Sequence, residues 1–441
     1  MERQPEREAS FISLRAYFRL VRGNRNFRRL WMAQIVSEIG DWFYTLAIYS
    51  LLLQLTGRAG SVALALVLQV LPQTFVGPAA GVVNDRVRRK HVMITADLVR
   101  MVIVFAMLLV RSRSAVWLLY PLLLAETIMA TFFEPARSAV IPNITSREDL
   151  LLANTLSSAT WSVNLLIGAS VGGAVAALLG RSAVFILNAL SFLLSALLIR
   201  GMRFQEPHAD SALPLRAQDL LDFSPVLEGI RYVRKDRRLL GAVCAKAGEL
   251  MIGPSWVLFT VMGQRYFAVH WQGIDPQRGA MLGMSLLMGA RGIGAVVGPL
   301  IFARWAGHSE RRLRFGILLG YCLVGLGYVA LGQVPNVWLA CLTVIFAHCG
   351  GSTVWVFSTT LLQLNTEDRF RGRVFAADLG FSMLTIAMGA YVCGLFLDAG
   401  ASARAVASST GLLMLLPAGL WGFSMHASKS ASVRASAESA D

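Results

Sequence analysis

Long apolar segments alternate with short polar ones along almost the whole chain. The apolar segments run for about 18 residues or more, which is enough for a helix to cross a hydrocarbon core of roughly 30 Å. Strands of a membrane barrel would be about ten residues long and would alternate in polarity, unlike these segments. The sequence therefore predicts an all-α membrane protein with twelve transmembrane helices. The expected spans are residues 30–54, 60–83, 91–110, 115–141, 151–180, 182–201, 238–263, 279–305, 314–333, 336–364, 374–397 and 403–425.

Composition supports a membrane protein over a soluble one. The chain has 441 residues, of which 55% are hydrophobic and 15% are charged. In a soluble protein about a quarter of the residues are charged. The cysteines all lie inside apolar segments, so we interpret them as packing residues instead of a disulfide framework. The cysteines are Cys244, Cys322, Cys341, Cys349 and Cys393.

Basic residues are distributed unevenly between the two sets of connections. Thirty arginines and lysines lie on the side of the two tails and of the 202–237 segment, against seven on the other side. Because cytoplasmic loops are enriched in these residues, we expect both tails to be cytoplasmic. The net charge of +15 then reflects topology, and its dispersal between spans disfavours nucleic-acid binding. The basic, amphipathic segment 1–29 is expected to lie partly on the membrane surface.

The chain also reads as two similar halves. Val76-Gly77-Pro78 recurs as Val297-Gly298-Pro299, 221 residues later, and duplicated halves around a midplane site are typical of secondary transporters. Ser224 and Pro225 predict the start of a surface helix that ties the halves together. The expected organisation is a cytoplasmic segment 1–29, a six-helix half 30–201, a linker 202–237, a second six-helix half 238–425 and a tail 426–441.

The stretch GVVNDRVRRK at 81–90 places one acid and four bases between two apolar segments. It resembles the signature between the second and third spans of the major facilitator superfamily, with Arg88 where that signature has a second glycine. Further segments, FRRLWMAQIVSEIGDW, FFEPARSAVIP, ARGIGAVVGP and STTLLQ followed by RGRVFA, are similar to the bacterial branch that contains macrolide and siderophore (enterobactin-type) exporters. The resemblance implies two pseudo-symmetric six-helix halves that alternate in access.

In that fold the charged loop would form a gate where the halves meet. Gly81 would let the second span approach the eleventh, and Asp85 would accept hydrogen bonds at the start of that span. The alternative is that the loop only directs membrane insertion, although Asp85 adds nothing to the positive-inside signal. The gating candidates are Gly81, Asp85, Arg86, Arg89, Asp97 and Asp378, the last two as expected partners of the arginines.

Ionisable residues inside a membrane are costly and are functional candidates by default. Glu38 and Asp41 lie one turn apart on the first span without a basic partner in that span, so we expect one of them to hold and release a proton. Pairing with a basic residue of another span is the equally weighted alternative. Glu126 and His348 are further candidates for proton coupling, and His348 has a structural, hydrogen-bonded role as its alternative.

The resemblance implies that spans 1, 4, 7 and 10 line a central cavity. Aromatic residues there suit an apolar, even cationic, compound. Lys246 and Glu249 are charged candidates, with mutual neutralisation as the alternative, and Glu134-Pro135-Ala136-Arg137 is interpreted as a structural bend. The cavity candidates are Phe132, Phe133, Lys246, Glu249, Trp355 and Phe357.

The predicted function is a proton-coupled exporter of an amphipathic organic compound, such as a drug, macrolide or siderophore. Glycines Gly168, Gly172 and Gly173 in the fifth span resemble, incompletely, the antiporter motif of the superfamily, and close helix packing is their alternative role. The sequence has no GxxxxGK[ST] motif, metal-ligand cluster or nucleophile–base motif, so we expect no ATP hydrolysis, enzyme activity, cofactor or metal. A lysophospholipid flippase is the alternative function, and a membrane-embedded enzyme is less favoured. We expect a monomer in the bacterial inner membrane, with a small-molecule substrate, protons and the lipid bilayer as its partners.

Overall fold

The computed structural model describes residues 14–146, 149–210, 215–216, 220, 223–247, 252–269, 275–307, 309–367 and 370–438. Within these residues the secondary structure is helical. The helices are α1 (Leu14–Gly23), α2 (Arg25–Thr56), α3 (Ala59–Arg86), α4 (Arg89–Met107), the 3-10 helix η1 (Arg113–Leu118), α5 (Leu119–Ile144), α6 (Leu150–Leu179), α7 (Arg181–Arg200), α8 (Pro207–Asp210), α9 (Ser224–Lys235), α10 (Arg237–Ala247), α11 (Ile252–Arg265), α12 (Pro276–Ala306), α13 (Glu310–Leu331), α14 (Val337–Asn365), α15 (Arg371–Asp398) and α16 (Ala403–Glu438).

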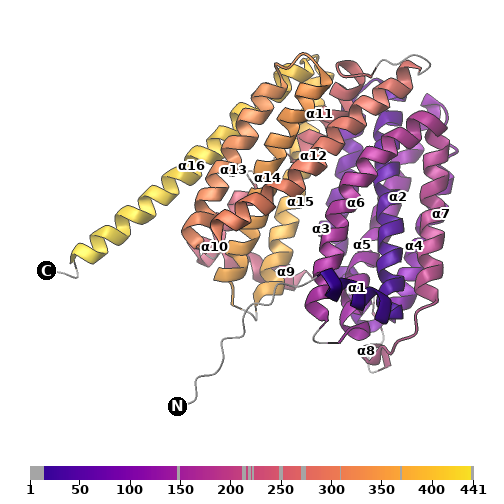
Figure 1. Cartoon of the computed structure of the whole chain (residues 1–441), viewed down its shortest axis with the longest axis horizontal. Helices are drawn as coiled ribbons and strands as arrows, with labels where there is room; N and C mark the ends of the chain where they lie inside the picture. Colours follow the sequence, from indigo (N-terminus) through magenta and orange to yellow (C-terminus); the bar gives the residue numbers. More distant parts are fainter. Residues whose placement is uncertain are drawn as a thin grey trace.

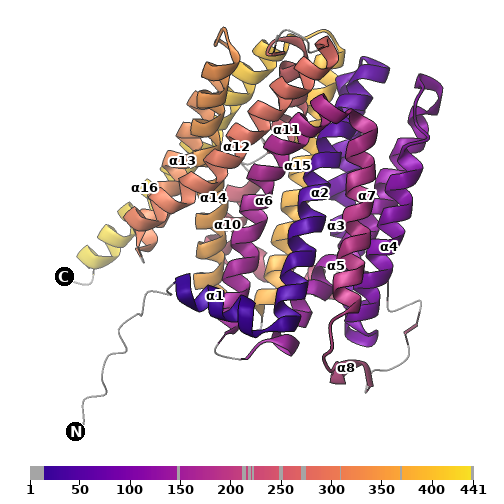
Figure 2. The same ribbon diagram turned by 45° about the vertical axis from the view of Figure 1, so that its right-hand side comes forward.

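The long helices form two bundles side by side, α2 to α7 and α10 to α16 (Figure 1). The main contacts between the bundles are α3 against α15 and α6 against α12. One end of the molecule bears the α3–α4 turn and the chain after α7, and we call it the linker end. The other end, with the α2–α3 and α15–α16 turns, is the far end. Helix α1 lies across the linker end (Figure 2).

Every predicted span falls on a helix, although the bounds shift. The span expected at 238–263 corresponds to α10 and α11, with residues 248–251 outside the described part. Helix α16 continues to Glu438, beyond the expected end at 425. Among the described residues, eight helices are long and apolar enough to cross a membrane. The total of twelve crossings remains a prediction.

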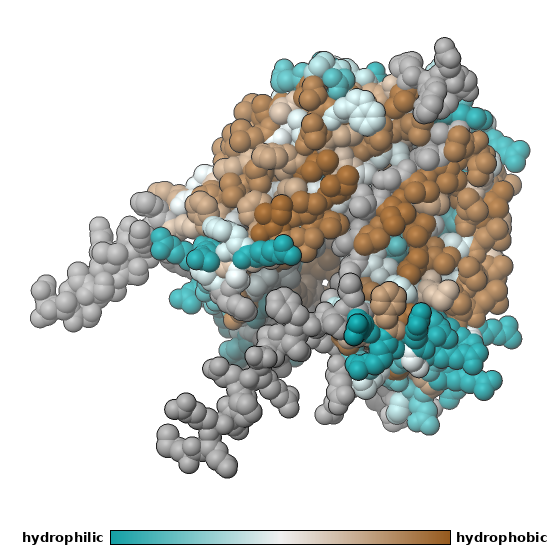
Figure 3. Space-filling view, viewed as in Figure 1, coloured by the Kyte–Doolittle hydropathy of each residue, from teal (hydrophilic) through white to brown (hydrophobic). Residues whose placement is uncertain are grey.

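The outer surface matches a protein surrounded by lipid. Apolar side chains cover the middle of the face seen in Figure 3, and polar ones gather toward its two ends. Large apolar side chains stay exposed on several helices, including Val102, Leu109, Leu420 and Phe423. Soluble monomers rarely expose apolar area on this scale. Together with the long helices, this surface indicates a multi-pass membrane protein.

The two halves contact each other closely near the far end. The Asp398 carboxylate at the end of α15 accepts hydrogen bonds from the backbone N–H groups of Ala59 and Gly60, at 2.7 and 3.0 Å. These N–H groups lie at the start of α3, where the helix dipole favours an anion. A Cβ on Gly394 would lie 2.7 Å from the Ala63 Cβ, so α15 and α3 meet almost backbone to backbone there.

Glycines also bring α6 close to α2. A Cβ on Gly168 would lie 2.5 Å from the Trp42 Cβ, and one on Gly172 would lie 2.9 Å from the Phe43 Cα. The close packing expected of this glycine-containing segment is therefore present. The side-chain surroundings of Gly173 lie outside the described part.

The linker contains the predicted surface helix, α9, which begins at Ser224 with a proline in its first turn. Its main neighbours are α15 and α10, both in the C-terminal half. Glu228 and Arg373 form an ion pair at 2.8 Å, and the rings of Tyr232 and Phe370 stack at 4.3 Å. These contacts attach α9 to one half, whereas the sequence suggested a helix tying both halves.

Candidate functional site

Arg100 of α4 lies at the centre of a largely buried group of charged side chains in the N-terminal half, of which the Asp41 side chain is 30% exposed. Its guanidinium is 2.8 Å from an oxygen of Asp41 on α2 and 2.7 Å from one of Glu126 on α5. The guanidinium carbon lies 4.0 Å from the centroid of the Phe192 ring. The Tyr44 hydroxyl donates to the other Glu126 oxygen at 3.1 Å. One cation therefore joins three helices.

A third carboxylate, Asp97, lies one turn before Arg100 on α4, with 3.9 Å between an oxygen and a guanidinium nitrogen. Asp97 is fully buried, and Arg100 is 4% exposed. We call Asp41, Asp97, Arg100 and Glu126 the Arg100 cluster. Three carboxylates around one guanidinium give an excess of negative charge. Because each uncompensated buried ion costs several kcal/mol, a bound proton would relieve this excess.

The structure distinguishes the two acids of the first span. Asp41 pairs with a basic residue of another helix, which was one of the two alternatives for this pair. Glu38, which is 9% exposed, instead accepts hydrogen bonds from amides, at 2.8 Å from Gln34 and 2.8 Å from Asn164. Arg137 donates to the Gln34 amide oxygen at 3.0 Å. Among the described residues, the Gln34 amide therefore connects Glu38 to a cation, Arg137, and Glu38 makes no direct contact with a cation.

The segment containing Glu134 and Arg137 is a continuous part of α5, with Pro135 inside the helix. The two charged residues pair with each other at 2.7 Å, and Glu134 is 53% exposed at its side chain. Arg137 also reaches Gln34 on α2. Arg137 thus connects α5 to α2 next to Glu38.

In the C-terminal half, Lys246 of α10 pairs with Asp378 of α15, and both side chains are 3% exposed. The Lys246 ammonium also lies 4.7 Å from the centroid of the Trp355 ring. Glu249, the partner suggested by sequence, lies outside the described residues. A buried lysine thus neutralises Asp378, which the sequence had placed opposite an arginine of the charged loop.

The described contacts of the charged loop at the linker end differ from the predicted ones. None of the described atoms lies within 4 Å of a Cβ built on Gly81, so α3 does not approach α15 there in this conformation. Asp85 is 78% exposed at its side chain and lies 3.7 Å from Arg89. Arg89 itself donates to the carbonyl groups of Asn84 and Ala139, at 3.1 and 3.0 Å.

The expected acidic partners of the loop are engaged elsewhere. Asp97 lies beside Arg100 and Asp378 beside Lys246, which corrects the predicted pairing of these acids with Arg86 and Arg89. Arg86 has other interactions. The closest contacts between α3 and α15 lie toward the far end instead, at Asp398 and Gly394. The gating role of the loop stays a prediction.

A cavity of about 360 Å³ lies on the inner side of the C-terminal half, with Trp161 of α6 closing its edge. Its walls come mostly from α12, α13 and α14 and are largely apolar. Arg291, Tyr321, Tyr328, His348, Ser352 and Trp355 provide its polar atoms. Among the described lining residues there is no carboxylate. The volume and lining are those of a small-molecule site.

His348 has a well-defined position in this cavity. Its Nε2 lies 3.2 Å from the Tyr328 hydroxyl, and its ring meets the Phe259 ring edge to face at 5.7 Å between centroids. The hydrogen bond matches the structural alternative for His348. It does not test a role in proton coupling.

Four aromatic rings and one arginine join the two halves beside the cavity. Trp42 of α2 and Trp256 of α11 stack in parallel, with 5.7 Å between ring centroids and 2° between planes. Trp161 and Tyr49 meet this pair edge on, at 6.2 and 6.0 Å. The Arg291 guanidinium carbon lies 4.2 Å from the Trp256 ring centroid. A relative movement of the halves must rearrange this aromatic group.

The aromatic cavity candidates divide between core and cavity. Trp355 lines the cavity. Phe133 is buried in the core of the N-terminal half, and Phe357 is 1% exposed and packs against Gly316 of α13. Phe132 is half-buried, and its carbonyl accepts a hydrogen bond from Asn84. Phe133 and Phe357 are therefore packing residues, whose side chains are buried between helices.

Sequence reasoning underrated two arginines. Arg100 and Arg291 lie in spans 3 and 8, outside the set expected to line the cavity, yet one organises three acids and the other lines the cavity. A single arginine inside an apolar span was the available signal. No group of three or more histidine, cysteine or acidic residues suited to a metal ion occurs among the described residues.

Comparison with known proteins places this architecture in a family. A sequence model of the Major Facilitator Superfamily matches residues 30–390. The chain is 24% identical over 379 residues to macrolide efflux protein A of Streptococcus pyogenes, covering 84% of this chain and 89% of the relative. It is 23% identical over 358 residues to the bacilysin exporter BacE of Bacillus subtilis, covering 75% and 83%.

Solved structures support the same fold. The nucleoside transporter NupG aligns with a TM-score of 0.68 at 13% identity, over 90% of this chain and 98% of that one. A bacterial homologue of the human lysosomal transporter Spinster aligns with a TM-score of 0.65 at 12% identity, over 93% and 97%. At such low identity these matches show the fold alone. With the family match across most of its length, the chain belongs to the major facilitator superfamily of membrane transporters.

Proposed function

We propose that the protein exports an amphipathic organic compound across a bacterial inner membrane in exchange for protons, by alternating access. The observation that supports this most is the Arg100 cluster, where a buried excess of carboxylates lies in a transporter fold. Relatives named for macrolide efflux and bacilysin export favour outward transport. The excess of arginine and lysine at the linker end favours a cytoplasmic location for that end and for both tails.

The proton-exchanging group is proposed to be the Arg100 cluster, with Glu126 as its central acid. Glu126 contacts both Arg100 and Tyr44, so its charge affects α2, α4 and α5 together. Protonating Glu126 or Asp41 would release part of the guanidinium and loosen these helices. Deprotonation would draw them together again, which links proton occupancy to helix arrangement. Glu38 and His348 rank below it because each is held by uncharged partners.

The cavity beside Trp355 is proposed to bind the substrate. Its apolar walls would hold the body of an amphipathic molecule, and Arg291, Tyr328 and Ser352 would orient its polar group. Apolar walls with a few polar side chains suit an amphipathic compound.

During alternating access, contacts between the two halves are proposed to break at one end of the molecule and form at the other. In this conformation Asp398 and the Trp42–Trp256 stack hold the halves together, while Asp85 is exposed. Inversion would separate the first set and bring Gly81 and Asp85 toward α15. Asp85 and Arg89 would then act in the closed linker end, and Asp85→Asn should slow transport without removing protein from the membrane.

The test uses everted membrane vesicles acidified by respiration. Addition of a transported compound should raise the internal pH, measured as recovery of acridine orange fluorescence, and macrolides, small hydrophobic peptides, siderophores and lysophospholipids are tested in parallel. Trp355→Ala should weaken the response by raising the half-saturating concentration. Trp338→Ala is the matched control, because Trp338 lies on the same helix and is 68% exposed on the outer surface.

The outcomes separate the proposed substrates. A response to macrolides or peptides that Trp355→Ala weakens and Trp338→Ala leaves unchanged supports export through this cavity. A response to lysophospholipids alone would instead assign the scaffold to lipid movement. Transport with no pH change in any arm would contradict proton exchange.

A further inference from the structure

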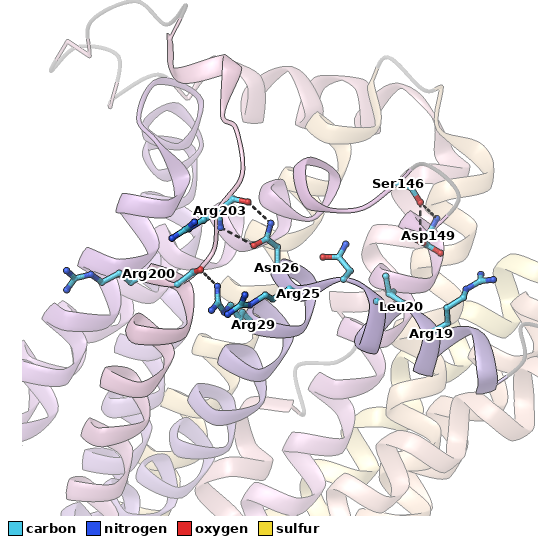
Figure 4. A pocket seen from close by; sticks show the side chains of 12 residues that line it. Arg19, Leu20, Arg25, Asn26, Arg29, Ser146, Asp149, Arg200 and Arg203 are labelled. Carbon is cyan, nitrogen blue, oxygen red and sulfur yellow. Dashed lines mark hydrogen bonds between the residues drawn. The ribbon is translucent and has the colours of Figure 1, made fainter.

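A second large cavity lies at the linker end of the N-terminal half, away from the proposed substrate site. Its volume is about 860 Å³, and it is bounded by α1 and the α1–α2 turn, the start of α6 and the end of α7 (Figure 4). Among the described residues that line it there are five arginines and one acid, Asp149. The arginines are Arg19, Arg25, Arg29, Arg200 and Arg203.

The frame of this cavity is fixed by hydrogen bonds between distant segments. The Asn26 amide donates to the Arg203 carbonyl at 2.6 Å and accepts from the Arg203 backbone N–H at 3.0 Å. The Arg29 guanidinium donates to the Gly201 carbonyl. Asn24 caps α2 by accepting from the Phe27 N–H at 2.9 Å. The turn before α2 is therefore tied to the segment after α7, and the cavity is a built feature of the fold.

Most of these arginine side chains have no anionic partner among the residues that the structure describes. Within the described part of the chain, the guanidinium groups of Arg19, Arg25, Arg200 and Arg203 make no hydrogen bond or ion pair, and Asp149 is engaged with Ser146 at 3.1 Å. Insertion into the membrane needs positive charge at this end, but it does not need three chain segments to bring that charge to one cavity. Guanidinium groups bind phosphate through paired N–H donors.

The neighbouring helix points to the source of that phosphate. On α1, Leu20 is buried against the bundle, while Phe18 on the opposite face is 64% exposed. Helix α1 lies across the end of the bundle (Figure 2), as an interfacial amphipathic helix does. An exposed aromatic ring beside a basic cavity matches the boundary between acyl chains and headgroups. We propose that this cavity binds the phosphate group of an anionic membrane lipid.

The proposal is tested on the purified full chain in detergent. Retention of phosphatidylglycerol is compared with that of phosphatidylcholine by native mass spectrometry, for wild type and for Arg25→Gln/Arg200→Gln/Arg203→Gln. A control triple, Arg231→Gln/Arg304→Gln/Arg311→Gln, removes the same charge from exposed sites on α9, α12 and α13. A separate arm adds inorganic phosphate alone and measures protection against thermal unfolding.

The wild type and the control triple should prefer phosphatidylglycerol by about tenfold or more, and the cavity triple should lose that preference, since each arginine adds attraction to an anionic headgroup. Because the replaced guanidinium groups hold nothing in the fold, the melting temperature of the cavity triple should match that of wild type; if it falls, Arg25→Gln alone is used. Protection by inorganic phosphate without a lipid preference would assign the same chemistry to a soluble ligand. An unchanged preference in the cavity triple, or an equal loss in the control triple, would overturn the proposal.

Discussion

Replacing Arg100 by methionine should destabilise the protein strongly and in a pH-dependent way. The substitution keeps most of the side-chain volume but leaves Asp41, Asp97 and Glu126 without their shared cation. Removing one partner of a buried ion pair costs about 3–5 kcal/mol, and Arg100 is 4% exposed. We expect a loss of that size at pH 8.

The loss should shrink as the pH falls toward 5. In the folded variant the buried carboxylates escape the charge penalty only by binding protons, whereas in the unfolded chain they ionise freely. Because the unfolded state then binds fewer protons than the folded state at high pH, the stability of the variant relative to wild type decreases as pH rises. Neutralising two of the acids as well, in Arg100→Met/Asp41→Asn/Glu126→Gln, should recover most of the lost stability at pH 8.

The assay is unfolding of the purified protein in detergent, followed by tryptophan fluorescence at pH 5 and pH 8. Arg314→Met is the control, because its pair with Glu310 has a similar distance of 2.8 Å but side chains that are 29% and 44% exposed. Such a pair contributes about 0–1 kcal/mol. If Arg100→Met unfolds like Arg314→Met at pH 8, or if the triple variant is no more stable than the single one, the Arg100 cluster is not a charge-balanced unit.

Three further predictions concern contacts between helices. Gly172→Ala should destabilise the protein by about 1–3 kcal/mol in unfolding assays, because its Cβ would meet the Phe43 backbone, whereas Gly77→Ala has open space and should not. Asp398→Asn should weaken the contact between α15 and the start of α3, so that cysteine probes placed there react several-fold faster; unchanged rates would refute this. Lys246→Met should lower the melting temperature through unpaired Asp378, and adding Asp378→Asn should restore it; no recovery would contradict a charge effect.

Hydropathy alone predicted the helices and their approximate ends, because lipid requires long apolar segments with internally satisfied backbone groups. The family resemblance of the 81–90 loop predicted the superfamily, which the family match confirms. The close helix approach expected at Gly81 and the buried contact expected of Asp85 are not seen among the described residues, so the gating role of this loop stays a prediction.

Within the site, sequence identified the acids but not their partners. Asp41 and Glu126 stood out as charges inside apolar spans, but their meeting at Arg100 depends on how α4 is rotated against α2 and α5. Apolar candidates were harder to place. Phe133 faces a helix neighbour and Trp355 a cavity, and both surroundings select for the same large apolar side chains.

Proton exchange at the Arg100 cluster is tested most directly in proteoliposomes with an imposed pH gradient. Wild type should concentrate substrate against its gradient while protons move in the opposite direction. Glu126→Gln should still equilibrate substrate downhill but fail to concentrate it, while Glu134→Gln, on the same helix and 53% exposed at its side chain, should behave as wild type. Concentration of substrate by Glu126→Gln to the wild-type level, or by wild type without proton movement, would contradict the proposed coupling.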